Sequence, residues 1–107
     1  MSKKYLIHAK YSASGVSGVL KLGGTTRQAA IEKMLADLGG KLETFYYTLN
    51  PDEAYLICEM PDDISAAAVS MHIDSTDKAD INLITLLTPA EIDQASKMVV
   101  HYRAPGS

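Results

Sequence analysis

The first residues of the chain alternate between apolar and polar side chains. Residues 4–11, KYLIHAKY, are rich in strand-forming residue types and end at a Ser/Ala/Gly cluster, so they predict a β-strand. The side chains of a strand point alternately to its two faces. One face therefore carries Tyr5, Ile7, Ala9 and Tyr11, and the other carries Lys4, Leu6, His8 and Lys10.

The next segment changes to helical spacing. Residues 14–22 carry apolar side chains three and four positions apart, which predicts a short helix. Two glycines, Gly15 and Gly18, lower the helix propensity of this segment. The pair Gly23-Gly24 then interrupts the chain.

A stronger helix is predicted directly after this break. Thr25 and Gln28 match a capping box, in which each side chain accepts a hydrogen bond from a free backbone N–H of the other. The expected apolar stripe consists of Ile31, Met34, Leu35 and Leu38. Gly39-Gly40 can supply the left-handed residue that ends a helix.

A β-hairpin is predicted in the middle of the chain. Residues 41–49 and 53–60 are both rich in strand-forming types, and Asn50-Pro51-Asp52 separates them. Proline cannot donate a hydrogen bond within a strand ladder, so Pro51 places the turn at this point.

Another helix follows the hairpin. Pro61-Asp62-Asp63 provides an acidic start that suits the positive end of a helix dipole, and the helix runs to about residue 73. Its expected buried face consists of Ile64, Ala67, Ala68 and Met71.

The last part of the chain predicts a fourth strand and a final helix. The dense apolar content of residues 80–87 indicates a strand that is covered on both faces. Thr88 and Glu91 form a second capping box, with Pro89 at the first helical position, so a helix is expected up to about residue 100.

This order of elements predicts an α+β fold of the ferredoxin-like βαββαβ type with a C-terminal helix. We expect a single domain over residues 1–107, with its core in residues 4–100 and a loose tail in residues 101–107. The first and third strands lie in the middle of an antiparallel sheet, and the helices cover one face. The other face keeps apolar residues, so we expect a homodimer in which the two sheets meet face to face.

Composition excludes several classes of protein. The chain has 107 residues, 47% of them hydrophobic and 21% charged, with a net charge of −3, which is typical of a folded globular domain. Its basic residues are scattered, so we expect neither nucleic-acid nor membrane partners. A single cysteine, Cys58, rules out an internal disulfide and indicates a reducing compartment. No signal-peptide core or long apolar span is present, so a cytoplasmic location is expected.

Four segments resemble the GYD domain family: KYLIHAKY, LGGKLETFYYTL, CEMPDD and LLTPAEID. The resemblance spans residues 4–97 and implies the dimeric α/β-barrel version of the ferredoxin-like fold. Where the family has its name-giving Gly-x-Tyr-Asp, this chain has Asn50-Pro51-Asp52-Glu53. Any role of that tyrosine therefore does not carry over, and the resemblance implies no activity.

Recognisable cofactor motifs are missing from the sequence. Three dispersed histidines, His8, His72 and His101, lack metal-ligand spacing, and no phosphate-loop or dinucleotide motif occurs, so we expect neither metal nor cofactor. Gly23-Gly24-Thr25-Thr26-Arg27 before a helix could hold a carboxylate or phosphate through its N–H groups, hydroxyls and Arg27. The alternative is a capped helix start with a solvated Arg27.

His8 is the leading candidate for a catalytic or binding residue because it lies in the middle of a strand, on the face that it shares with Lys4, Leu6 and Lys10. If the third strand is its neighbour, Tyr55 and Glu59 share this face, and Thr85 of the fourth strand joins them by alternation. His8 could then act as a base or hydrogen-bond donor that Glu59 or Tyr55 positions. The alternative is a structural histidine, with Glu59 paired to a neighbouring lysine.

Three functional hypotheses follow from these residues. The first is a small-molecule binding or sensing domain that acts as a homodimer. The second is a cofactor-free enzyme, similar to a monooxygenase or isomerase, that uses a barrel-facing His8; this rests on fold-level analogy. The third is an oligomerisation module without a ligand.

Overall fold

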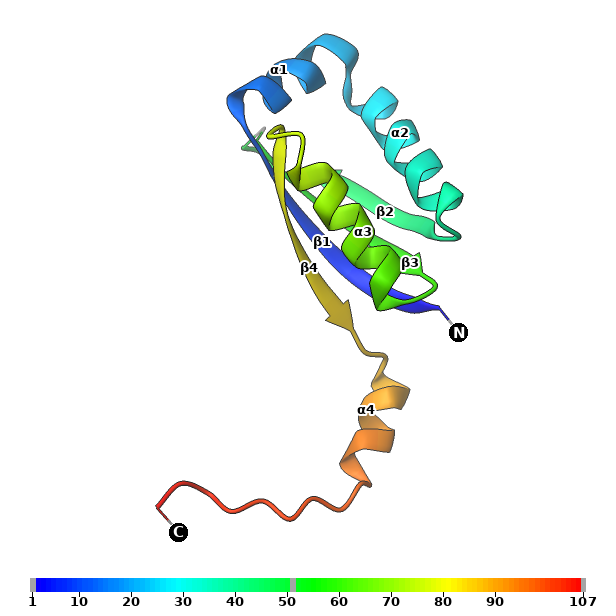
Figure 1. Ribbon diagram of the computed structural model, residues 1–107, viewed down its shortest axis with the longest axis vertical. Helices are drawn as coiled ribbons and strands as arrows, with labels where there is room; N and C mark the ends of the chain where they lie inside the picture. Colours follow the sequence, from blue (N-terminus) through cyan, green and yellow to red (C-terminus); the bar gives the residue numbers. More distant parts are fainter. Residues whose placement is uncertain (1, 51, 107) are drawn as a thin grey trace.

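The computed structural model describes residues 2–50 and 52–106 of the chain. It confirms a βαββαβ arrangement in which the first helical segment is split in two and a further helix follows the last strand (Figure 1). In chain order the elements are β1 (Lys3–Tyr11), α1 (Ala13–Leu22), α2 (Gly24–Asp37), β2 (Lys41–Tyr47), β3 (Glu53–Met60), α3 (Asp63–Asp74), β4 (Ala79–Leu86) and α4 (Pro89–Ser96).

The four strands form one antiparallel sheet in the order β2-β3-β1-β4. The first and third strands therefore occupy the middle, as the sequence predicts. The hairpin between β2 and β3 is also present, and the backbone N–H of Thr48 donates to the carbonyl of Glu53 across it. Pro51, which the sequence places at the centre of this turn, lies outside the described residues.

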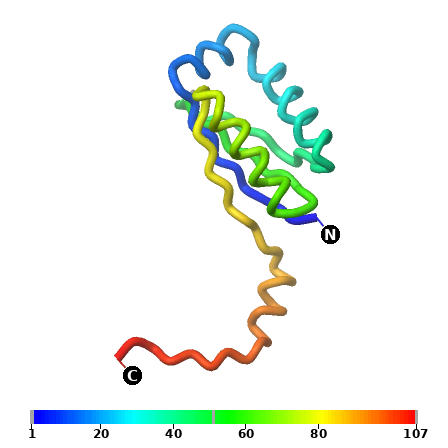
Figure 2. The backbone as a smooth tube through the Cα atoms, viewed as in Figure 1, coloured from blue at the N-terminus to red at the C-terminus, as the bar shows by residue number. Residues whose placement is uncertain are grey.

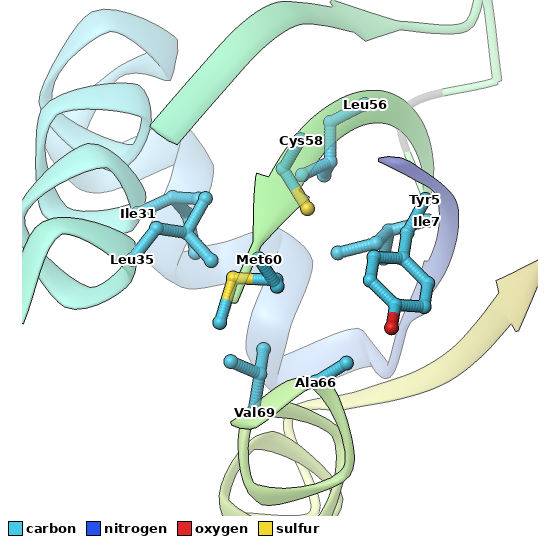
Figure 3. Packing of buried hydrophobic residues seen from close by; sticks show 9 residues of the cluster. All are labelled: Tyr5, Ile7, Ile31, Leu35, Leu56, Cys58, Met60, Ala66 and Val69. Carbon is cyan, nitrogen blue, oxygen red and sulfur yellow. The ribbon is translucent and has the colours of Figure 1, made fainter. Parts of the chain in front are cut away.

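The core lies between one face of the sheet and two helices (Figure 3). Alternate residues of the central strands supply its sheet side, and α2 and α3 supply its helix side. The buried cluster consists of Tyr5, Ile7, Ile31, Leu35, Leu56, Cys58, Met60, Ala66 and Val69. The predicted alternation along β1 is confirmed, because Tyr5 and Ile7 are buried here whereas Leu6 and His8 point to the other side.

The boundary between α1 and α2 depends on a glycine. Gly23 adopts a positive φ of 88°, which only glycine reaches without strain, and α2 begins at the next residue. The predicted capping box of Thr25 and Gln28 is wrong, because Thr25 already lies inside the helix and, among the described residues, no side chain caps its start. At the other end Gly39, with a φ of 81°, provides the predicted left-handed residue.

The predicted buried face of α3 is also wrong. Ala66 and Val69 are buried, whereas Ile64 and Met71 point to solvent. Contacts at the start of the helix determine this orientation. Asp62 caps the helix by accepting from the N–H of Ser65 at 2.8 Å, and Asp63 accepts from the Tyr5 hydroxyl and the Lys3 ammonium group. These bonds hold the pKa of both carboxyls below the usual value.

The C-terminal arm, residues 88–106, leaves the body of the protein (Figures 1 and 2). The predicted capping box of Thr88 and Glu91 is present in full, but α4 ends at Ser96 rather than near residue 100. The radius of gyration is 17.0 Å, against roughly 13 Å for a compact chain of this length. The arm therefore has little of its own chain to pack against.

Two glycines of α1 provide a matched test of how closely this helix packs against Lys78. A Cβ atom at Gly15 would collide with the carbonyl oxygen of Lys78, whereas a Cβ at Gly18 meets no atom within 4 Å. We predict that Gly15→Ala lowers the free energy of unfolding by about 1 to 3 kcal/mol through overpacking. Gly18→Ala should raise it by about 0.5 to 1 kcal/mol through helix propensity. Urea denaturation of both variants checks the prediction, and equal effects would contradict it.

The buried thiol of Cys58 predicts a loss of stability in alkali. Burial, with a smaller contribution from Glu43, raises the pKa of Cys58 from 9.0 to about 11. Above pH 9 the unfolded chain releases this proton and the folded chain keeps it, so the free energy of unfolding falls by about 1 kcal/mol per pH unit. We expect Cys58→Ala to show a shallower decline between pH 9 and 10 in chemical denaturation. A slope identical to that of the wild type would contradict this role.

Candidate functional site

The sheet has an open face, opposite the one that the helices cover. It carries Lys4, Leu6, His8, Lys10, Thr44, Tyr46, Glu53, Tyr55, Ile57, Glu59, Asp80, Asn82, Ile84 and Leu86. Leu6 lies at its centre, in register with Ile57 on one side and Ile84 on the other. Within a single chain the described residues cover only one face of β4, because Ile84 on the open face is 50% exposed.

His8 is held between two side chains of β3 on this open face. Its Nε2 atom lies 2.8 Å from Oε1 of Glu53, and its ring stacks on Tyr55 with centroids 4.6 Å apart at 24°. The side chains of His8 and Glu53 are 23% and 28% exposed, so the pair is shielded but still reachable. An ionised carboxylate can only accept, so Nε2 carries a hydrogen and Nδ1 of the neutral ring is left as the acceptor. This arrangement can accept a proton or a hydrogen bond at a defined point.

The carboxylate that contacts His8 is not the predicted one. Glu59 lies in register with Lys4, two rows away from His8. The predicted alternative, a bond from Glu59 to a lysine, is not found among the described residues, where Lys4 instead pairs with Glu43 at 2.9 Å. This bond to Glu43, with a weaker effect of Glu59, raises the pKa of Lys4. Extending the alternation of β3 to its first residue would have identified Glu53 as the partner of His8.

Thr85 lies on the opposite side from His8, which corrects the sequence prediction. In the ladder between β1 and β4 it is in register with Tyr5, a core residue. Alternation correctly groups Thr85 with Leu83, but it cannot tell which of the two faces the group occupies. His8 instead has Asn82 beside it.

Arg27, the remaining predicted ligand-binding residue, lines a groove on the helix side of the sheet, whereas His8 lies on the open face. We call this the α1–α3 groove; its volume is about 460 Å³. Its lining consists of Tyr11, Ser14, Gly15, Gly18, Val19, Leu22, Thr26, Arg27, Ala30, Ile31, Met34, His72, Ile73, Thr76 and Lys78. Sequence reasoning missed this groove because its walls come from three helices and from the loop before β4.

Two cations lie at the α1–α3 groove. The ammonium group of Lys78 donates to the Ser14 hydroxyl at 3.0 Å. Among the described residues, no carboxylate lies within ion-pair distance of either Arg27 or Lys78. His72 donates from Nδ1 to the carbonyl oxygen of Ala68 at 2.8 Å, so its Nε2 is the acceptor of the neutral ring.

The two adjacent tyrosines of β2 point to opposite faces, as alternation predicts. Tyr46 is exposed on the open face, whereas Tyr47 packs under the helices. Burial, followed by the nearby Tyr11, raises the pKa of Tyr47 to about 12. Its hydroxyl oxygen is enclosed and has no hydrogen bond of ordinary geometry within the described part of the chain. Tyr47 therefore lies on the opposite side of the sheet from His8, whereas Tyr46 shares the open face and is in register with Tyr55.

The described residues contain no group of three or more His, Cys, Asp or Glu side chains that could hold a metal ion. Cys58 is fully buried, so its thiol is not positioned to react with an external substrate. No helix within residues 2–50 and 52–106 has both the length and the apolar character needed to cross a membrane.

Comparison with known proteins identifies the family. The family model for the GYD domain matches residues 5–96, which is nearly the whole chain. No match was found among curated proteins. Because the family model covers well over half of the sequence, the chain belongs to the GYD domain family.

Proposed function

We propose that this GYD domain protein is a homodimer that binds a small molecule between its two open faces. The observation that carries this proposal is the cluster of His8, Glu53 and Tyr55, which lies beside the uncovered apolar centre of the sheet. A fixed imidazole next to a flat aromatic ring suits recognition of a small planar compound with a polar group.

The open face has the properties of a self-complementary surface. Its centre is the row of Ile57, Leu6 and Ile84, which leaves apolar area in contact with water in a single chain. Both ends of the face carry charges of both signs: Lys4 stands beside glutamates, and Lys10 lies in register with Glu53 and Asp80. A twofold axis through the centre would bury the apolar row and bring opposite charges together.

The C-terminal arm supports a second copy independently. Its apolar side chains are largely exposed: Ile92, Met98, Val99, Val100 and Tyr102. Burying side chains of this kind stabilises a protein by about 1.5 to 3 kcal/mol each. An arm that leaves the body of its own chain gains this burial on a partner chain.

The His8–Glu53 pair favours one alternative function, a cofactor-free enzyme. A carboxylate 2.8 Å from Nε2 holds the ring in one orientation and leaves Nδ1 free to act as a base. Nδ1 is then the atom that removes a proton from a bound substrate. The same site therefore suits either ligand binding or proton transfer. If the space between the two open faces of the dimer proves to be filled by side chains, only the function of an oligomerisation module remains.

The dimer is tested by a charge placed in the apolar row. Ile84→Lys changes a side chain that is half exposed in one chain, so the fold of the monomer should survive. We predict that this variant weakens dimerisation by at least 100-fold, because a face-to-face contact would bury the new ammonium group without a partner. Sedimentation equilibrium of the variant and the wild type measures this effect.

Leu20→Lys is the matched control for the dimer test, because Leu20 is 86% exposed on α1 and lies away from the open face. It should leave the association constant within threefold of the wild type. A wild-type protein that stays monomeric at micromolar concentration, or an Ile84→Lys variant that dimerises normally, would refute the homodimer.

The binding site is tested with 2-naphthol, a planar molecule with one hydroxyl donor. We predict that it shifts the imidazole C–H resonances of His8 in NMR titrations, and that His8→Gln or Tyr55→Leu lowers its affinity at least tenfold. His72→Gln, a matched change on the helix side, should leave the affinity unaltered. Binding of 2-naphthol that all three variants retain would exclude the open face as its site, and absence of binding to the wild-type dimer would count against a planar ligand.

A further inference from the structure

We propose that the α1–α3 groove is a second binding site, on the opposite side of the sheet from His8, and that it takes a monocarboxylate with an apolar body. The groove is present in a single chain. The inference therefore depends neither on the homodimer nor on the ligand proposed for the open face.

The size of the α1–α3 groove fits a small molecule. Its volume of about 460 Å³ lies within the range of roughly 300 to 1,000 Å³ that small-molecule sites occupy. It adjoins a narrow void of about 10 Å³ that reaches the core between α2 and α3. Ile31, Met34 and Ile73 line both spaces, together with Tyr11 and Arg27. Most side chains at the interior end of the groove are therefore apolar, and the apolar body of a ligand would lie against them.

The charge of the lining points to an anion. The chain has 13 acidic residues and a net charge of −3, yet the described residues that line the groove include no Asp or Glu. They do include Arg27 and Lys78. A region with two cations and without a carboxylate, in an acidic protein, favours a negatively charged ligand.

Arg27 is the residue best suited to hold the carboxylate. Its guanidinium group presents a planar fork of donors that matches a carboxylate in a bidentate arrangement. It lies near the start of α2, where the helix dipole adds to the positive field. Thr26 belongs to the same lining, and its hydroxyl can donate a second hydrogen bond to a carboxylate.

Gly18 makes the groove open to ligands. It lies in the middle of α1, where glycine weakens a helix, and a Cβ atom built there meets no atom within 4 Å. A larger side chain at this position would extend into the space that a ligand needs. Gly18→Leu is therefore a blocking variant, and Gly18→Ala is its milder counterpart.

The test uses three probes, each below its solubility and micelle limit: decanoate, decanol and acetate. Decanoate has both the charge and the apolar body, decanol lacks the charge, and acetate lacks the body. Isothermal titration calorimetry should show decanoate binding most tightly, decanol at least tenfold more weakly, and acetate without measurable heat. Decanol binding as tightly as decanoate would refute the role of the two cations.

Variants then locate the binding site. We expect Arg27→Gln to weaken decanoate at least tenfold while leaving decanol within threefold, because only the charged contact is removed. Arg27→Lys should recover part of the loss. Lys21→Gln removes a cation from the last turn of α1, outside the groove lining, and should leave decanoate binding within twofold of the wild type.

The blocking variants supply the second line of evidence. Gly18→Leu should abolish binding of decanoate and decanol alike, whereas Gly18→Ala should weaken both by less than fivefold; circular dichroism confirms that each variant is folded. If the wild type does not bind decanoate, or if Arg27→Gln and Gly18→Leu both bind it normally, the groove is not this site. Because His8→Gln should leave decanoate binding unchanged, failure here is distinguishable from failure at the open face.

Discussion

The packing of α2 and α3 on the same face of a four-stranded sheet is the constraint on which the other properties of this chain depend. Tyr5 of β1 and Met60 of β3 bury their side chains against these helices. Because side chains alternate along a strand, the residues next to them in each strand point to the opposite face. That face receives no helix within the described chain. An open face with an apolar centre is therefore a direct result of how the core forms.

Local sequence patterns predicted most of the fold because each depends on a few neighbouring residues. The capping box of Thr88 and Glu91 and the left-handed Gly39 are examples, since their geometry is determined within one turn. The orientation of α3 could not be predicted in this way. Its sequence contains two apolar stripes. The contact of Asp63 with Tyr5 of β1 helps to select the stripe that is buried, and these two residues are 58 positions apart in the sequence.

The candidate sites were predictable only as far as alternation reaches. It placed His8 and Tyr55 on one face correctly, and it placed Thr85 on the wrong one, because alternation groups residues without stating which group faces the helices. Glu43 lies at a register shift between Leu42 and Thr44, which no spacing rule reveals. The α1–α3 groove needed the tertiary structure, since its walls are distant in sequence.

The sheet also separates the two proposed sites physically. His8 and Tyr11 belong to the same strand, yet one contributes to the open face and the other to the floor of the α1–α3 groove. A substitution on one face therefore leaves the side chains of the other face in place. For this reason, a ligand that binds between two chains and a ligand that binds within one chain can be distinguished by variants of single residues.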